Sequence, residues 1–390
     1  MRDNYKRLQG LMFKSNVEVL VVSAPENLFY VADIPTGFTA ANRLLFCSRH
    51  NSPLACVVPR VGEPALVLSA AALDVVSRHT WVKDLRLYAT GTYILRKNKI
   101  ELAGETFIET LSTVISDMLS PQKNTLGIEL NDFSALNYEA LKKAITNSNI
   151  VDASEILMSS RMIKNDEEIR RFKKATSILC KVMHKVEDAM KDRPTEQNLD
   201  IVLKSEMMKE GAESWQQTTI AAGRISGPDI YNQPVPRRRI RSGDLIRLDV
   251  GCVYKGYTAD LSRTYAVDKI HPRASKTYKV LKDAFTKYLN DLKPGTPASS
   301  INIGVVEYVR KNLDMEYYRG NVGHGVGVEL YDRPLLGPDD HTTLQEGMTL
   351  SYEVPYHISG LAGLNIEDSV LITERGKQVV SDYDRDIIVV

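Results

Sequence analysis

The stretch from residue 244 to residue 260 constrains the fold of this chain more than any other. Residues 245–250 are largely apolar and predict a buried strand that follows a Gly-containing turn. Residues 253–257 predict a second strand. Because Gly251 and Gly256 permit a tight reversal of the backbone, the two strands are expected to form a hairpin.

Two carboxylates, Asp249 and Asp260, lie at the ends of these predicted strands. A hairpin of this length can turn both side chains toward one point, where their like charges repel unless a cation lies between them. Taken alone, the pair is better explained as ordinary acids at strand ends, because burial of unpaired charge is unfavourable. Residues further along the chain are needed to decide between the two readings.

Composition indicates an ordinary globular protein. Of the 390 residues, 25% are charged and 43% apolar, and the net charge is +1, so nothing indicates binding to nucleic acid or an anionic membrane. The chain lacks an apolar run of the ~20 residues that span a bilayer. The cysteines Cys47, Cys56, Cys180 and Cys252 follow no disulfide-like or metal-binding spacing, which is typical of reduced thiols in a cytosolic protein.

The chain is long enough for two domains. In the first part, predicted strands alternate with predicted helices, which favours an α/β domain with at least partly parallel strands. The pattern breaks over residues 151–165, after which Asp166-Glu167-Glu168 begins a helix that extends to about Met190. We therefore predict an α/β domain over residues 1–155 and an α+β domain over residues 156–390. In the second domain, Thr195 is the expected N-cap of a helix that ends at Gly211.

Three more residues in this second domain carry chemistry. His324 lies among the glycines of residues 323–327, Glu353 ends a predicted apolar strand, and Glu367 begins the last long one. Each has an ordinary structural explanation when it is considered singly. Together with Asp249 and Asp260 they form an oxygen-rich ligand set suited to two divalent ions such as Mn²⁺, Co²⁺, Zn²⁺ or Fe²⁺. Water held between two such ions loses a proton near neutral pH, so the set predicts hydrolysis.

The ordered series of five ligands resembles that of the pita-bread metallopeptidases, a family that includes Xaa-Pro dipeptidase, aminopeptidase P, methionine aminopeptidase and creatinase. The supporting segments are residues 243–251, 256–264, 323–325 and 363–368. Residues 7–9 and 23–27 are similar to the creatinase-like N-terminal domain of prolidases. The resemblance therefore covers nearly the whole chain and implies a pita-bread fold for its second domain.

The resemblance also implies roles for these residues. Asp249 would bind one metal ion, and Asp260 and Glu367 would bridge both. His324 and Glu353 would serve the other ion or the nucleophile, and Glu353 holds the position of the general base. Mn²⁺ or Co²⁺ would be the metal, and the protein would form a homodimer.

Two positions depart from the family pattern. Prolidase-type members carry a histidine before the first metal-binding aspartate and another seven residues after the metal-binding histidine. Asn232 and Tyr331 occupy these places. Both side chains can hold an oxyanion by hydrogen bonds, but neither titrates near pH 7 as histidine does.

Three functions follow from this reading. The first is a cytosolic dinuclear-metal hydrolase of a small amide, most simply an Xaa-Pro dipeptide. The second keeps the fold and the metals but acts on a non-peptide amide, an amidine or a ring, or is a lyase. The third is a catalytically silent binding protein, which the complete ligand set argues against because a binding module has no need of buried like charges.

Overall fold

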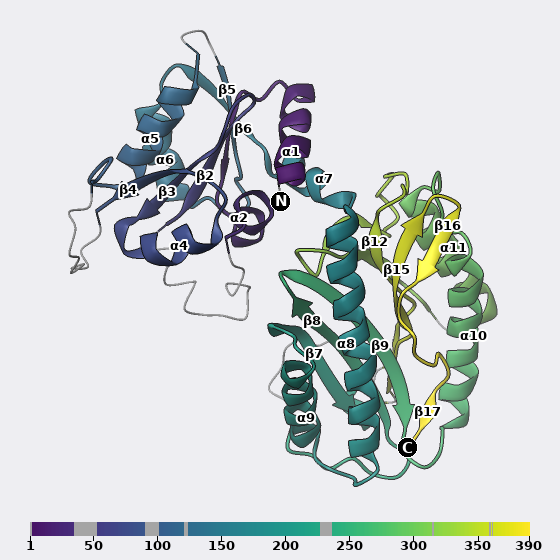
Figure 1. Ribbon diagram of the computed structural model, residues 1–390. Coiled ribbons are helices and arrows are strands. Elements are labelled where there is room, and N and C mark those ends of the chain that lie inside the picture. Colours follow the sequence, from purple (N-terminus) through teal and green to yellow (C-terminus); the bar gives the residue numbers. More distant parts are fainter. Residues whose placement is uncertain are drawn as a thin grey trace. The chain divides into compact units, whose positions relative to one another are not determined.

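The computed structural model describes residues 2–34, 53–89, 101–120, 124–226, 236–313, 316–358, 360 and 362–390. It divides into two compact units, residues 1–161 and 162–390 (Figure 1). The division falls at the end of helix α7, Ser154–Met162, whereas the sequence placed it between residues 155 and 156.

The first unit is built on a mixed sheet. Among the described residues, its strands follow the order β4-β3-β2-β1-β5-β6, with β1 parallel to β5, β5 parallel to β6, and β1, β2 and β3 antiparallel in turn. The strands are β1 Val19–Val22, β2 Ala55–Pro59, β3 Ala65–Ser69, β4 Asp84–Tyr88, β5 Asn124–Ile128 and β6 Ser148–Asp152. The helices are α1 Arg2–Lys14, α2 Pro25–Ala32, α4 Leu73–His79, α5 Phe107–Met118, α6 Ala135–Ala144 and α7. The predicted α/β class of this unit is confirmed.

The sheet of the first unit is buried because its central strands are continuously apolar. All residues of β1, β2 and β3 are buried. Helices α5 and α6 pack on the sheet through residues such as Leu111, Val114 and Leu141. The predicted break over residues 151–165 was wrong, because this segment contains the end of β6 and the whole of α7. The strand β6 is a polar, half-exposed edge strand, so it lacks the apolar run that would have revealed it.

The first sheet of the second unit lies under two helices. Its strand order is β17-β9-β8-β7, and α8 and α9 cover one face (Figure 1). The bounds are α8 Asp166–Met190, α9 Glu196–Lys209, β7 Ser214–Ala222, β8 Leu245–Tyr254, β9 Tyr257–Ala266 and β17 Ile388–Val389. As predicted, α8 begins directly after residue 165 and Thr195 caps α9, its side chain accepting a hydrogen bond from the Asn198 N–H.

The hairpin β8–β9 differs from the prediction in its bounds. The predicted second strand over residues 253–257 spans the turn, and Asp249 and Asp260 lie inside β8 Leu245–Tyr254 and β9 Tyr257–Ala266 and not at strand ends. Residues 245–254 form a single continuous strand, and the chain reverses only at Lys255-Gly256, both of which have positive φ. Gly251 does not turn the chain. It stands directly opposite Asp260 in the antiparallel register, and a Cβ atom at Gly251 would lie 3.0 Å from the Ala259 carbonyl oxygen. Gly251 therefore allows the backbones of β8 and β9 to approach closely and does not form a turn.

A second sheet and two helices complete this unit. The sheet order is β11-β10-β12-β15-β16, and β13 pairs with β14 in a small separate sheet. The strands are β10 Gly323–Gly325, β11 Asp332–Leu335, β12 Thr349–Glu353, β13 Tyr356–Ile358, β14 Ala362–Leu364, β15 Glu367–Thr373 and β16 Gly376–Val379. The helices are α10 Pro272–Leu289 and α11 Ala298–Asn312, and the short 3-10 turns η1 Ala70–Ala72 and η2 Gly223–Ser226 lie elsewhere in the chain. Helices α10 and α11 share one apolar core with β12 and β15.

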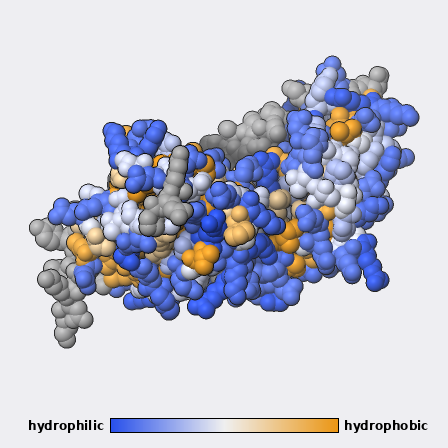
Figure 2. Space-filling view, turned by 90° about the horizontal axis from the view of Figure 1, so that it is seen from above, coloured by the Kyte–Doolittle hydropathy of each residue, from blue (hydrophilic) through white to orange (hydrophobic). Residues whose placement is uncertain are grey.

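The surface and the cysteines add little to the functional argument. Figure 2 shows a mainly hydrophilic face on which apolar residues form small separate areas. Within the described residues, no helix has both the length and the apolar character needed to cross a bilayer. Cys56, Cys180 and Cys252 are buried free thiols, as predicted, while Cys47 lies outside the described residues.

Candidate metal centre

The sheet formed by β7, β8 and β9 has one apolar and one polar face. Ile246, Leu248 and Val250 of β8 pack into the core beneath α8 and α9. The alternation of a β-strand therefore turns Arg247 and Asp249 to the opposite face. Because Gly251 is paired with Asp260, that aspartate shares the face with Asp249 and has no side chain directly opposite it.

The second sheet brings the other acids together. Glu353 at the end of β12 is paired directly with Glu367 at the start of β15. Two strand positions away, His324 of β10 is paired with Ser351 of β12. Residues directly opposite each other point to the same side, so the register alone places both glutamates on the face that holds His324.

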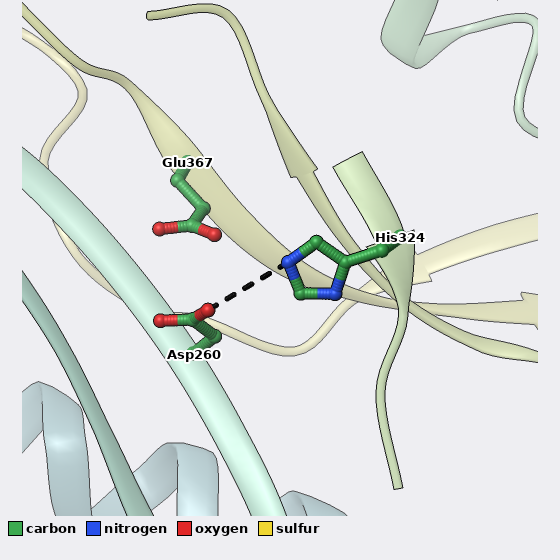
Figure 3. Close-up of side chains that lie close together, drawn as sticks. All are labelled: Asp260, His324 and Glu367. Carbon is green, nitrogen blue, oxygen red and sulfur yellow. Dashed lines mark ion pairs between the residues drawn. The ribbon is translucent and has the colours of Figure 1, made fainter. Parts of the chain in front are cut away.

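The two polar faces meet at a buried cluster. Asp260, His324 and Glu367 point toward one another from three different strands (Figure 3), and one ligand atom of each lies within 4.8 Å of the others. The Nε2 atom of His324 is 3.8 Å from Oδ2 of Asp260. All three side chains are buried. Asp260, His324 and Glu367, three of the five predicted ligands, thus converge from distant parts of the sequence.

The electrostatics of the cluster include the remaining two acids. Burial raises the pKa of Asp260 well above its ordinary value, and the charges of Asp249 and Glu353 raise it further. Burial likewise raises the pKa of Glu367, and the charges of Asp260, Asp249 and Glu353 raise it further. Four carboxylates therefore repel one another in a space without solvent, which a protein tolerates when cations neutralise them.

The imidazole of His324 is prepared as a neutral ligand. Burial is the main cause that lowers its pKa. Its Nδ1 atom lies 3.0 Å from the Gly325 carbonyl oxygen, so Nδ1 carries the proton and donates it there. Nε2 is then a lone-pair donor that faces the Asp260 carboxylate. Two electron donors at this distance need an electrophile between them.

Two carboxylate oxygens of the cluster without hydrogen-bond partners also indicate a site for divalent ions. Oδ1 of Asp260 and Oε2 of Glu367 are buried and accept no hydrogen bond from any described residue. Buried carboxylate oxygens in proteins are normally satisfied by hydrogen bonds or by metal coordination. Oxygen and imidazole donors in this number suit Mn²⁺, Co²⁺, Zn²⁺ or Fe²⁺. Asp249, Asp260, His324, Glu353 and Glu367 are the residues that would hold them.

Several supporting residues escaped the sequence reading. The amide of Gln217 on β7 donates to Oδ1 of Asp249 at 2.7 Å, and Ser351 donates to Oε1 of Glu367. Asn365 donates to Oε2 of Glu353 at 3.1 Å, while Nη2 of Arg319 lies 3.2 Å from Oε1 of the same glutamate. Such contacts orient metal-binding carboxylates.

Only part of this support had a signal in the sequence. Ser351 and Asn365 each stand two residues before a glutamate of the set, so strand alternation could have placed Ser351 on the same face. Gln217 could not be placed from the sequence, because a register shift between Trp215 and Gln217 changes which side chains of β7 point to the polar face. Arg319 precedes β10 and had no signal.

Of the two positions that depart from the family pattern, the structure describes Tyr331 but not Asn232. The Tyr331 ring stacks on the His324 ring with 3.9 Å between centroids, so this residue lies at the cluster. The side chain is 47% exposed, so its burial is only partial, but this partial burial and the charges of Glu353 and Asp260 raise the pKa of the phenol. The hydroxyl therefore stays protonated and can donate. Asn232 lies outside the described residues.

Family models match both units. The model described as metallopeptidase family M24 matches residues 170–374, which include all five predicted ligands. The chain belongs to this family. The creatinase/prolidase N-terminal domain matches residues 5–163. The recognition made from the sequence is therefore confirmed, and so is the pita-bread fold of the second unit.

Relatives and solved structures agree with this membership. The M24 chain is 29% identical over 272 residues to the Xaa-Pro dipeptidase of Pyrococcus horikoshii, covering 68% of this chain and 75% of that protein. It also resembles the solved prolidase of Thermococcus sibiricus, with a TM-score of 0.85, 20% identity and coverage of 100% and 99% of the two chains. The X-Pro aminopeptidase of Thermotoga maritima gives a TM-score of 0.81 at 20% identity and 99% coverage of each chain.

Membership in family M24 fixes the class of activity. The protein is a metallohydrolase and a metal-dependent peptidase, and metallopeptidases of this family use divalent metal ions. The hypothesis of a catalytically silent binding protein loses its support. The substrate and the number of ions are a separate question.

Proposed function

We propose that this M24 metallopeptidase hydrolyses Xaa-Pro dipeptides with two divalent ions, Mn²⁺ or Co²⁺, held by the five predicted ligands. The observation that carries the proposal is the pairing of Glu353 directly with Glu367, beside a third buried carboxylate, Asp260. Arg319 carries a positive charge beside Glu353, and one divalent ion neutralises two of the other three carboxylates. A second ion would neutralise the last carboxylate and would take His324 as a ligand.

The ligands divide by position. Asp260 and Glu367 lie close to His324 and to each other, which supports the proposal that these three residues would hold metal together. Asp249 lies on the β7 side, where Gln217 fixes its orientation. The bound ions would supply an acidified water and would polarise the carbonyl of the scissile amide.

Glu353 is the residue placed to move the proton. Asn365 holds one of its oxygens and Arg319 the other, so the carboxylate keeps one orientation while it takes a proton from water and passes it to the leaving nitrogen. The phenol of Tyr331 can donate a hydrogen bond to the carbonyl oxygen as that atom becomes an oxyanion.

A dipeptide panel tests the proposal. Metal-free protein would be loaded with Mn²⁺, Co²⁺ or Zn²⁺ and assayed on Ala-Pro, Leu-Pro, Ala-Ala and Ala-Pro-Ala, with metal content measured in parallel. We expect Xaa-Pro cleavage with about two ions per chain and loss of cleavage with a chelator. Turnover of Ala-Ala at the Ala-Pro rate, or full activity with one ion per chain, would contradict it.

A second candidate is hydrolysis of a non-peptide amide or ring on the same fold. It is favoured by Tyr331, because a stacked phenol that stays protonated cannot replace a titrating imidazole. The double substitution Asn232→His with Tyr331→His discriminates between the two. If the native substrate is an Xaa-Pro dipeptide, the two histidines should preserve or raise its turnover; if it is a different amide, they should lower turnover of the native substrate.

We also propose a homodimer in the cytosol whose only ligands are the metals and a small substrate, without nucleic acid or membrane. The near-zero net charge supports the absence of polyanion binding. Sedimentation of the purified protein at two concentrations checks the dimer, and a single monomeric species would contradict it.

A further inference from the structure

Thr219 occupies a position beside the metal centre that the proposed chemistry does not use. It lies on β7 and pairs directly with Asp249 of β8. Its neighbours Ile220 and Ala222 pack into the core beneath the helices, so alternation turns Thr219 to the polar face with Asp249. The residue is 5% exposed, and its hydroxyl has no hydrogen-bond partner among the described residues.

An unsatisfied buried hydroxyl calls for an explanation. Threonine is isosteric with valine, and a strand that only needed packing at this position would be more stable with the apolar residue. The hydroxyl does not orient Asp249, because it makes no hydrogen bond to that carboxylate, whose Oδ1 accepts from Gln217. The group that satisfies Thr219 is therefore expected to be one that arrives beside Asp249.

The position of Glu353 indicates which part of a substrate this is. Glu353 lies on β12 of the other sheet and delivers the proton to the leaving nitrogen in the proposed reaction. With this role for Glu353, the leaving group would lie toward β12. The acyl residue, which is the first residue of a dipeptide, would then lie toward β8 and β7.

We propose that the Thr219 hydroxyl hydrogen-bonds a hydroxyl side chain on the first residue of the substrate, so that Ser-Pro and Thr-Pro are preferred dipeptides. This inference rests on the proposed function and deepens it by naming the substrate class. Thr219 is a specificity-determining residue in this proposal, and it takes no part in metal binding or proton transfer.

A cycle of isosteric changes tests the contact. The wild type and Thr219→Val are assayed on Thr-Pro and Val-Pro, which differ from each other as threonine differs from valine. We expect Thr219→Val to lower kcat/KM about fivefold to tenfold for Thr-Pro and to change it less than about twofold for Val-Pro. Thr219→Ser should restore the preference, because serine keeps the hydroxyl.

Two controls separate this role from a structural one. Thr110→Val removes another buried hydroxyl without a partner among the described residues, on α5 of the first unit, and should leave both substrates unaffected. Thr219→Val should melt no lower than the wild type, because it removes a buried polar group. An equal loss of kcat/KM on both dipeptides would overturn the proposal and assign Thr219 to the metal centre.

Binding measured without turnover distinguishes failure of the subsite from failure of the proposed function. Thr-Pro and Val-Pro analogues whose amide is reduced to an amine are titrated calorimetrically into the Mn²⁺-loaded wild type and Thr219→Val. Coupling between residue 219 and the analogue side chain supports the subsite even if the dipeptides are not cleaved. Absence of coupling in an enzyme that cleaves Xaa-Pro refutes the subsite alone, and absence of both coupling and cleavage refutes both proposals.

Discussion

Glu353 and Glu367 show how one cross-strand pair can define a metal centre. Like charges directly opposite each other destabilise an antiparallel sheet, and burial makes their repulsion stronger. Ser351 satisfies one oxygen of Glu367, and Asn365 satisfies one oxygen of Glu353, so neutral donors fix both carboxylates. Only Glu353 has a positive charge beside it, that of Arg319. The folded protein therefore holds this repulsion until cations arrive, and metal binding and stability are linked.

Glu367→Gln should have opposite effects with and without metal. Burial and the neighbouring acids raise the pKa of Glu367 above its ordinary 4.5, so the folded, metal-free protein holds this proton more tightly than the unfolded chain. Its stability therefore falls as pH rises above that value. At pH 7 we expect the metal-free variant to melt about 2–4 °C above the metal-free wild type, by removal of ~1 kcal/mol of repulsion.

Addition of Mn²⁺ should reverse this order, because the variant has lost a ligand. Calorimetric scans at pH 5 and pH 7 with and without the ion provide the measurement. Glu374→Gln, at an exposed residue directly after β15, is the matched control and should change neither scan. A variant that melts lower in both states would show that Glu367 is not under repulsion.

Tyr331→Phe should separate catalysis from packing. The ring stack on His324 survives in this variant while the hydroxyl is lost. If the phenol holds the oxyanion, kcat falls about 10²-fold to 10³-fold with little change in KM or in metal affinity. Steady-state kinetics on the best dipeptide measure both, and Tyr318→Phe at an exposed tyrosine is the control. Unchanged kcat would remove Tyr331 from the mechanism.

The hairpin β8–β9 is the element that carries Asp249 and Asp260. Its strands are paired along their full length, from Leu245 opposite Ala266 to Tyr254 opposite Tyr257. The rigidity of this ladder fixes the separation of the two aspartates, and the register is set at a two-residue turn. The turn at residues 255–256 therefore determines the relative position of Asp249 and Asp260 through the register of the two strands.

Two substitutions at the turn should have opposite effects on stability. Lys255 has φ of 47° and Gly256 has φ of 75°, which a turn of this type prefers to fill with Asn-Gly. Lys255→Asn should raise the free energy of unfolding by about 0.5–1 kcal/mol, and Gly256→Ala should lower it by about 1–2 kcal/mol. Urea denaturation measures both, and equal effects of the two substitutions would exclude a backbone cause.

The sequence predicted most elements but not how they register. Helix α8, which has a long apolar pattern, was found with correct bounds. The polar edge strand β6 was missed, and β8 was ended too early, because local propensity reads Gly251 as a break whereas the pairing with Asp260 keeps it extended. Gln217 was missed for the same reason, since a bulge depends on the partner strand.

At the scale of the whole molecule, an ionic network joins the last residues of the chain to the catalytic sheets. The fully buried Arg263 of β9 pairs with Asp368 of β15 at 2.7 Å, and Asp368 also accepts hydrogen bonds from Ser381 and Arg385. Arg263 donates to the carbonyl of Tyr383 as well. Strand β17 then pairs with β9 in parallel. The sequence revealed the units through family resemblance, but this network had no local signal.

Asp368→Asn should destabilise only the second unit. It leaves the buried Arg263 charge without its counter-ion, and the cost of breaking such a pair is about 3–5 kcal/mol. We expect one calorimetric transition to move to lower temperature while that of residues 1–161 stays in place. Asp382→Asn at an exposed neighbour should change neither transition. Equal movement of both transitions would show that the units unfold as one.

The pairing of β17 with β9 has a consequence for biosynthesis. Strand β9, which bears Asp260, cannot pair with β17 until residues 388–389 have left the ribosome. The strands that bear the other predicted ligands are synthesised earlier. Nascent chains should therefore bind Mn²⁺ weakly at every shorter length. The ions are expected to enter a finished enzyme and not to guide its folding during translation.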